Sequence, residues 1–139
     1  MYLIDTDVIS ELRKGSKANL GVRNFFAAAA RREVALYLSV ITLGELRQGV
    51  ERIRYRGDVV QADELERWLE NLRADYSGNI LPFEDDGADL WGRLRVPHAE
   101  NPLDKQIAAI ALIHDLVIVT RNVAHFKPTG VRWHDPFSE

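Results

Sequence analysis

The sequence has no cysteine among its 139 residues. A disulfide framework and a zinc site built on thiolates are therefore both excluded. A chain without disulfides suits a reducing compartment. The N-terminus agrees, because Met1 is followed by only three apolar residues before Asp5, with no basic start and no long apolar segment. We therefore expect a cytoplasmic protein.

Long hydrophobic runs are missing as well. No stretch approaches the roughly 20 apolar residues that a transmembrane helix needs, so we expect no membrane contact. Hydrophobic residues make up 46% of the chain and charged residues 28%, which is typical of globular proteins and not of disordered ones. The length predicts one domain that covers residues 1–139.

Charge of one sign is not in large excess, since the net charge is −3, but the charges are unevenly distributed. Residues 1–60 hold ten Lys and Arg against seven Asp and Glu, and residues 61–139 hold eight against fourteen. Such asymmetry fits a polyanion-binding face beside an acidic site, and it fits an ordinary solvated surface too. Charge alone does not decide between them.

Short apolar strands alternate with helices along the chain. This order predicts a parallel sheet with helices on both faces, that is, a three-layer α/β/α sandwich around a mostly parallel sheet of roughly four or five strands. The pattern predicts strands at residues 2–4, 34–40, 80–81, 117–119 and 131–133, and helices at residues 6–12, 19–32, 42–50, 59–75, 85–95 and 103–114.

Polar clusters follow two of these strands. Asp5, Thr6 and Asp7 come after the first strand, and the segment 120–122 (Thr-Arg-Asn) comes after the strand at 117–119. In parallel α/β sheets, functional sites gather at the carboxyl ends of the strands. We therefore expect a site at this edge of the sheet.

Three acids stand at helix starts, and each alone has two interpretations. Asp5 precedes a helix for which Thr6 and Asp7 offer capping oxygens. Glu45 lies three residues after Thr42, as in a capping box. Asp104 lies in the first turn of its helix. Each residue fits a helix cap as well as a functional site. If the three converge, their carboxylates suit Mg²⁺ or Mn²⁺, which prefer oxygen ligands and can activate water beside a phosphate.

The histidines are not expected in a shared metal site. They lie in a loop, at a helix end and near the C-terminus, so surface or capping roles are favoured for His98, His114, His125 and His134.

Four segments in order resemble PIN-domain ribonucleases, in particular the VapC/FitB-like toxins of bacterial type II toxin–antitoxin pairs. They are LIDTDVISELRKG at 3–15, SVITLGELRQGV at 39–50, ILPFEDDGADLWGRL at 80–94 and PLDKQIAAIALIHDLVIVTRNVAHF at 102–126. The resemblance covers nearly the whole chain. It implies a PIN-like fold and a site in which Asp5, Glu45 and Asp104 bind Mg²⁺ or Mn²⁺.

The sequence departs from the family pattern at three positions of the implied site. Asn122 occupies the fourth acidic position, and His125 stands where many relatives have another acid, so the resemblance implies one firm cation with Asn122 orienting water or phosphate. Asp7 replaces the usual asparagine and is either an added carboxylate or, as we favour, a helix cap.

The resemblance gives further residues supporting roles. Thr6 and Thr120 would supply hydroxyl groups beside the ligands, and Arg121 would touch a substrate phosphate or form a salt bridge.

The resemblance also implies an activity and partners. The chain would be a metal-dependent endoribonuclease that hydrolyses RNA with a metal-activated water, forms a homodimer, and is silenced by a cognate antitoxin that lies in a groove. The apolar stripe of Leu65, Trp68, Leu69 and Leu72 would line that groove or belong to the core.

Two alternatives stay open at this point. A PIN domain with weak catalysis could act mainly by binding its antitoxin, since Asn122 and His125 replace acids. The segment D-T-D-V at 5–8 also fits the nucleophile motif of haloacid-dehalogenase-like phosphatases, although Lys105 follows the acid pair at 85–86 instead of preceding it.

Overall fold

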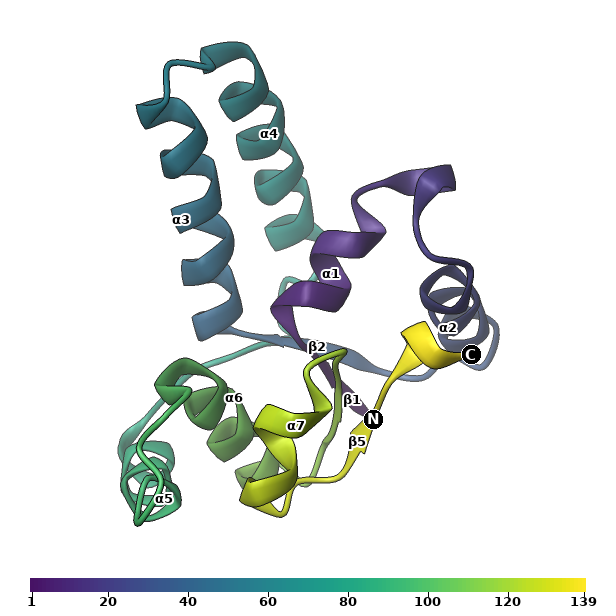
Figure 1. The fold of residues 1–139 in the computed structure, drawn as a ribbon. Coiled ribbons are helices and arrows are strands. Elements are labelled where there is room, and N and C mark those ends of the chain that lie inside the picture. The colour runs from purple at the N-terminus through teal and green to yellow at the C-terminus, as the bar shows by residue number, and fades with distance from the viewer.

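A sheet of five parallel strands lies at the centre of the computed structural model, which describes residues 1–139 (Figure 1). The strand order is β3-β2-β1-β4-β5, and every neighbouring pair is parallel. The strands are β1 (Tyr2–Ile4), β2 (Leu36–Ser39), β3 (Ile80–Leu81), β4 (Val117–Val119) and β5 (Trp133–His134).

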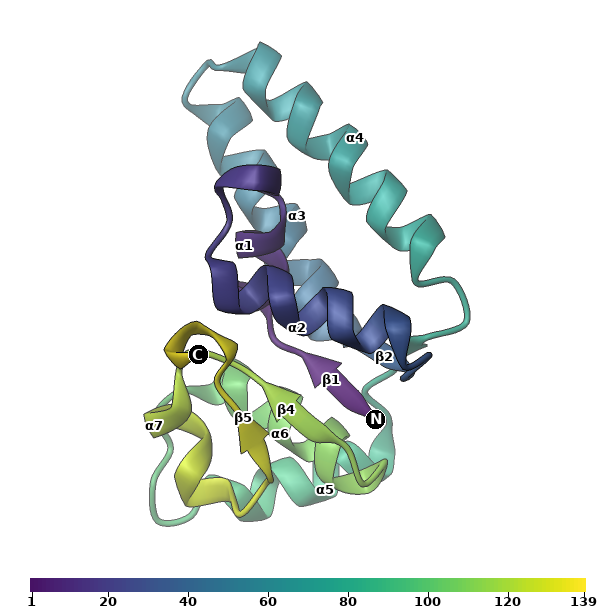
Figure 2. The ribbon, with the colours of Figure 1, turned by 90° about the vertical axis from the view of Figure 1, so that its right-hand side faces the viewer.

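Helices cover both faces of this sheet, which confirms the predicted α/β/α layers (Figures 1 and 2). One layer holds α1 (Thr6–Leu12), α2 (Leu20–Arg31), α3 (Val40–Tyr55) and α4 (Val59–Asp75), and the other holds α5 (Asp85–Leu94), α6 (Pro102–Ile113) and α7 (Val123–Phe126). Short 3₁₀ turns are η1 (Gly15–Lys17), η2 (Lys127–Thr129) and η3 (Pro136–Ser138). None of the helices has the length and apolar character to cross a membrane.

Alternation along the strands divides the core into two clusters. Leu3 of β1 packs with Ile107 and Phe126 on the α6 side, whereas Ile4, the next residue, packs with Val22 and Leu69 on the α2 and α4 side. Successive side chains of a strand point to opposite faces, so three residues of β1 supply both cores. Burial of each such side chain contributes about 1.5–3 kcal/mol.

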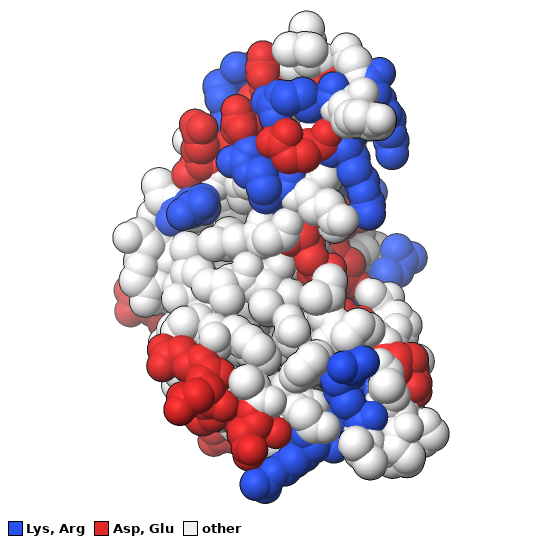
Figure 3. Space-filling model, turned by 90° about the vertical axis from the view of Figure 1, so that its left-hand side faces the viewer, with Lys and Arg blue, Asp and Glu red and all other residues white.

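Helices α3 and α4 form a hairpin that extends beyond the sheet (Figures 1 and 2). Ion pairs join its two helices, with Arg47 contacting Glu66 and Arg54 contacting Asp63 and Glu66. Figure 3 shows basic and acidic side chains interleaved over this upper part of the molecule. Exposed pairs of this kind stabilise a fold only weakly, so the network mainly sets how the two helices lie together.

Near the site, the start of one helix and the capping residue of another differ from the sequence prediction. Helix α3 begins at Val40 and not at Thr42, because the Ser39 hydroxyl caps it by accepting a hydrogen bond from the Thr42 N–H at 3.1 Å. Helix α1 is capped by Asp5, not by Thr6 or Asp7. The last strand is Trp133–His134 instead of 131–133.

Candidate active site

Asp5 lies at the point where β1 ends, beside the end of the neighbouring strand β4. Its Oδ2 accepts a hydrogen bond from the Thr120 hydroxyl at 2.8 Å, and its Oδ1 accepts one from the Thr6 N–H at 2.8 Å. Only 2% of Asp5 is exposed. The residue therefore caps α1 and also joins the two strands, so the two interpretations of Asp5 are compatible.

Glu45 reaches this group from helix α3. The Thr6 hydroxyl donates to its Oε1 at 2.7 Å, and the same hydroxyl lies 3.0 Å from Oγ1 of Thr42. The capping-box interpretation of Glu45 is wrong, because Ser39 caps the helix and the Glu45 carboxylate points to Thr6. Thr6 thus connects the first turn of α1 to the first turns of α3.

Asp104 approaches from the opposite layer, in the first turn of α6. Asn101 precedes this helix in the left-handed region, with φ 55°, a conformation that asparagine tolerates better than most residues. Nδ1 of His125, from α7, lies 2.6 Å from Oδ2 of Asp104. The surface or capping role expected for His125 is therefore wrong, since its ring donates to a site carboxylate.

Asp7 does not cap its helix, which corrects the role we favoured. Its Oδ2 accepts from the Arg121 N–H at 3.0 Å, so it ties α1 to the loop that follows β4. Its Oδ1 is buried and has no hydrogen-bond partner. A buried acceptor without a partner costs free energy of folding. Oδ1 of Asp7 is therefore a candidate ligand for a cation.

Asn122 and Arg121 lie at the rim of the acidic group. The Asn122 N–H donates to the Thr120 hydroxyl oxygen at 2.9 Å, whereas its side-chain amide has no bond to the acids. The guanidinium of Arg121 lies 4.6 Å from the ring centroid of Phe137 and makes no salt bridge. Arg121 is exposed, so its charge is accessible from solvent.

The carboxylates repel one another inside this partly buried group. Burial raises the pKa of Asp5 well above its ordinary value, and the charges of Asp7 and Asp104 raise it further, against the hydrogen bonds from Thr120 and Thr6. Burial also raises the pKa values of Asp7 and Glu45, and the charge of Asp104 adds to both shifts. Each shift reports that a negative charge there is poorly compensated.

The donor set fits a hard divalent cation by its chemistry. It consists of carboxylates with hydroxyl groups beside them, the oxygen ligands that Mg²⁺ and Mn²⁺ prefer, and Oδ1 of Asp7 lacks a partner. No three acidic or histidine side chains stand at the spacing of a preformed metal site. Glu45 and Asp104 instead form hydrogen bonds with Thr6 and His125.

Lys105 supports the site and was missed in the sequence. It is buried in α6, and its Nζ donates to the carbonyl oxygens of His98 and Glu100, both at 2.6 Å. It thereby fastens the loop before α6 to the turn that carries Asp104. The signal was the one lysine in a largely apolar helix. A lysine held in this way is not available as the lysine of a dehalogenase-like phosphatase.

Comparison with known proteins adds to this geometry. The family model described as the PIN domain matches residues 2–129. Toxin FitB of Neisseria gonorrhoeae is 32% identical, over 97% of this chain and 100% of the relative. VapC ribonuclease Y4jK of Sinorhizobium fredii is 29% identical, over 99% of this chain and 98% of the relative.

A solved structure agrees with the fold in detail. FitAcB from Neisseria gonorrhoeae superimposes with a TM-score of 0.78 at 29% identity, and the match covers 100% of both chains. The two chains therefore share one fold over their whole length. The chain belongs to the PIN domain family, in the group of VapC/FitB-like toxins.

Proposed function

We propose that this chain is an endoribonuclease dependent on Mg²⁺ or Mn²⁺, and that it acts as the toxin of a toxin–antitoxin pair. The observation that carries the proposal is the meeting of Asp5, Asp7, Glu45 and Asp104 at one edge of the sheet, with uncompensated negative charge. The relatives named as a toxin and as a ribonuclease support it. We place its action in the cytoplasm, where RNA is available.

Asp5, Glu45 and Asp104 would hold the cation. When bound, a divalent ion there lowers the pKa of water and offsets charge on a phosphate. Thr120 and Thr6 hold the carboxylates of Asp5 and Glu45 in place through the hydrogen bonds described above.

The rim residues would act on the substrate and on the ligands. The exposed charge of Arg121 would meet the substrate phosphate, and the Asn122 amide would orient water or phosphate. His125 orients Asp104 through its ring N–H. Because neither Asn122 nor His125 supplies a carboxylate, the site would hold one cation firmly.

A groove beside this site would take the antitoxin. It has a volume of about 200 Å³, lies between α1, α3 and α4, and is lined by Thr6, Glu45, Gly49, Leu65, Trp68 and other residues. Leu65 and Trp68 are half-buried at its wall, Leu69 lines it from the core, and Leu72 is buried in the core without lining it. Because Glu45 is at its end, a bound segment with a basic side chain would reach the acids. A homodimer stays a prediction from the resemblance.

A PIN domain with weak catalysis is the second candidate. The contact between His125 and Asp104 favours it, since the ring occupies one oxygen of a proposed ligand.

The first prediction concerns cleavage. Separate variants Asp5→Asn, Glu45→Gln and Asp104→Asn should each lower cleavage of single-stranded RNA, in Mg²⁺ or Mn²⁺, on the order of 100-fold, because each removes one charged ligand. Asp89→Asn is the control, since its side chain is 69% exposed on α5, and should cleave normally. Wild-type protein that cuts no RNA with either ion, or site variants that cut normally, would contradict the mechanism.

The second prediction concerns stability without metal. Because the pKa of Asp5 is raised in the fold, its ionised form destabilises the folded state at neutral pH. That penalty disappears as pH falls through the raised pKa toward about 4, the unfolded value. In a chelator at pH 7.5, Asp5→Asn should therefore raise Tm by a few degrees, and the difference should vanish near pH 4.

Thermal unfolding followed by circular dichroism measures this, and Mn²⁺ should then raise the Tm of the wild type but not of Asp5→Asn. A lower Tm for the variant at pH 7.5 would show that the Asp5 charge is compensated within the protein itself.

The third prediction concerns the number of cations. His125→Asp should raise the Mn²⁺ stoichiometry from one to two in calorimetric titration, because it adds a carboxylate beside Asp104. His98→Asp is the control, as its side chain is 69% exposed in a loop. Two ions bound by the wild-type protein would refute the single-cation site.

The fourth prediction tests the groove. Gly49 lines it, and a side chain there would meet no atom within 4 Å, so Gly49→Leu should fill the groove and keep helix α3 intact. We expect the affinity for the cognate antitoxin to fall at least about tenfold, with RNA cleavage retained. Gly44→Leu is the matched control, on the same helix, equally open and outside the groove. Equal affinity of both variants would place the antitoxin elsewhere.

A further inference from the structure

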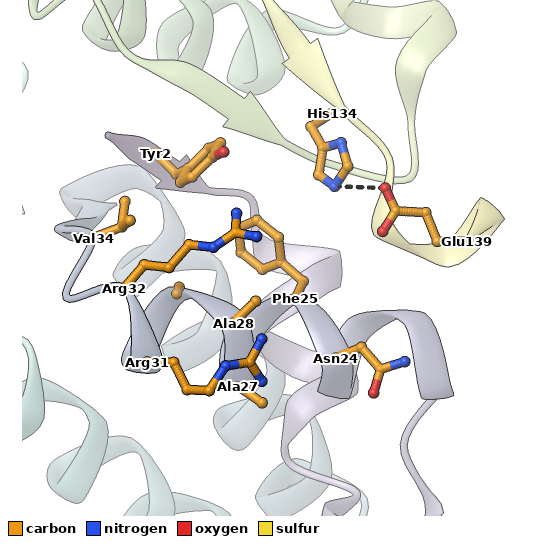
Figure 4. Close-up of a pocket in the computed structure, with 11 residues that line it drawn as sticks. Tyr2, Asn24, Phe25, Ala27, Ala28, Arg31, Arg32, Val34, His134 and Glu139 are labelled. Atoms are coloured by element: carbon orange, nitrogen blue, oxygen red, sulfur yellow. Dashed lines mark ion pairs between the residues drawn. The ribbon is translucent and has the colours of Figure 1, made fainter.

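A second hollow lies between α2 and the β5 edge of the sheet, away from the antitoxin groove. Its volume is about 470 Å³, which is within the usual range of small-ligand sites. Figure 4 shows Arg31 and Arg32 from the end of α2 and Phe25 from its middle around this hollow, with His134 and Glu139 across from them. We refer to it as the α2 pocket.

Small side chains create the space. Asn24, Ala27, Ala28 and Arg31 follow one another at helical spacing, so they share one face of α2, and all four line the pocket. Two alanines in the middle of that face leave room that longer side chains would fill. The hollow is therefore set by the α2 sequence.

The walls combine positive charge with aromatic rings. Arg31 and Arg32 are exposed, and neither guanidinium has an ion pair or hydrogen bond within the protein. The Phe25 ring lies 5.1 Å from that of Tyr2 and 5.5 Å from that of His134, measured between centroids. Glu139 is the one acidic residue of the lining, and its side chain is paired with His134 at 3.1 Å. Both guanidinium charges are thus free for an external anion.

One residue of the pocket wall, His134, is connected to the acidic site through the sheet. The carbonyl oxygen of His134 accepts from the Thr120 N–H at 3.0 Å, and the Thr120 hydroxyl donates to Asp5. Two strand spacings, about 10 Å, separate β5 from β1. The exposed guanidinium of Arg121 lies 4.6 Å from the ring centroid of Phe137, which belongs to the segment between His134 and Glu139.

We infer that the α2 pocket binds one nucleotide of the single-stranded RNA substrate, with its phosphate at Arg31 and Arg32 and its base against Phe25. The inference rests on the proposed ribonuclease function. Free guanidinium groups bind phosphate, and aromatic faces beside a basic surface are the common platform for unpaired bases. An acidic peptide would use the arginines but has no need of the aromatic wall, so RNA is favoured.

Two variants test the pocket in independent ways. The double variant Arg31→Ala/Arg32→Ala removes the charge, and Ala27→Leu fills the space without a change of charge. Matched controls on the same helix are Arg23→Ala and Ala30→Leu, which are exposed and do not line the pocket. Circular dichroism checks that all four fold.

Binding is measured first in the presence of a chelator, so that no cleavage occurs. The probe is a fluorescently labelled single-stranded RNA of about 12 nucleotides, long enough to span the acidic site and the α2 pocket, and binding is followed by fluorescence anisotropy. We expect both pocket variants to weaken binding at least about fivefold and the controls to leave it unchanged. In the arginine variant, the dependence of log affinity on log salt should become shallower by about 0.7 for each phosphate that the missing guanidinium groups no longer neutralise.

Cleavage is measured next on the same RNA and on a dinucleotide that only reaches the acidic site. KM for the longer RNA should rise in both pocket variants with kcat unchanged, and the dinucleotide should be cut normally. If the wild type cuts RNA while the pocket variants bind and cut like the controls, the pocket inference is wrong and the proposed function stands. If the wild type cuts no RNA, the proposed function is wrong. The anisotropy measurement then still tests whether the α2 pocket binds RNA.

Titration with adenosine 5′-monophosphate, adenosine and inorganic phosphate separates the parts of the ligand. The titrations are followed by NMR. We expect the chemical shifts of Phe25 and His134 to change with the nucleotide and to change less with adenosine. Phosphate alone should leave the shifts of these two residues unchanged. If the arginine variant instead weakens antitoxin binding and leaves RNA binding intact, the pocket is a protein contact and the inference is overturned.

Discussion

The hydrogen bond from Thr120 to the buried carboxylate of Asp5 is the interaction on which the rest depends. It exists only because β1 and β4 are neighbouring parallel strands that end at the same level, with Ile4 opposite Val119. Two apolar strands of three residues each therefore fix the position of a charge that would be unstable in either strand alone. The core and the site share one constraint, since a shift in strand register would separate Asp5 from Thr120.

That constraint has an energetic cost, which the fold bears. Asp5 is 2% exposed and is near Asp7 and Asp104, so its ionisation is opposed by burial and by like charge. Hydrophobic burial on both faces of the sheet can offset a penalty of this size, because the clusters around Leu3 and Ile4 each hold nine buried residues. The packed core thus stabilises a fold that the repulsion among the acidic side chains destabilises. Such a balance is expected where the residues of a site are kept at a cost in folding free energy.

Much of this was predictable from the sequence, and the failures have a physical pattern. The apolar runs located the sheet, and the polar residues at 5–7 and 120–122 located the edge that carries the candidate site. Side-chain partners were not predictable, because local spacing describes only the residue's own helix. Glu45 matched a capping box yet bonds Thr6, which is 39 positions away, and His125 bonds Asp104 across two helices. The α2 pocket was likewise invisible, since it depends on how β5 lies against α2.

The acids also come from different layers, and this explains how a cation would act on the fold. Glu45 lies near the start of α3 on one face of the sheet and Asp104 near the start of α6 on the other, while Asp5 lies between them at the end of β1. If these three residues hold the cation, as proposed, the bound ion would connect the two helix layers through the sheet edge. Binding would then stabilise the folded chain in proportion to its occupancy. The same carboxylates repel one another when no cation offsets their charge, so the stability of the fold would depend on the concentration of the metal ion.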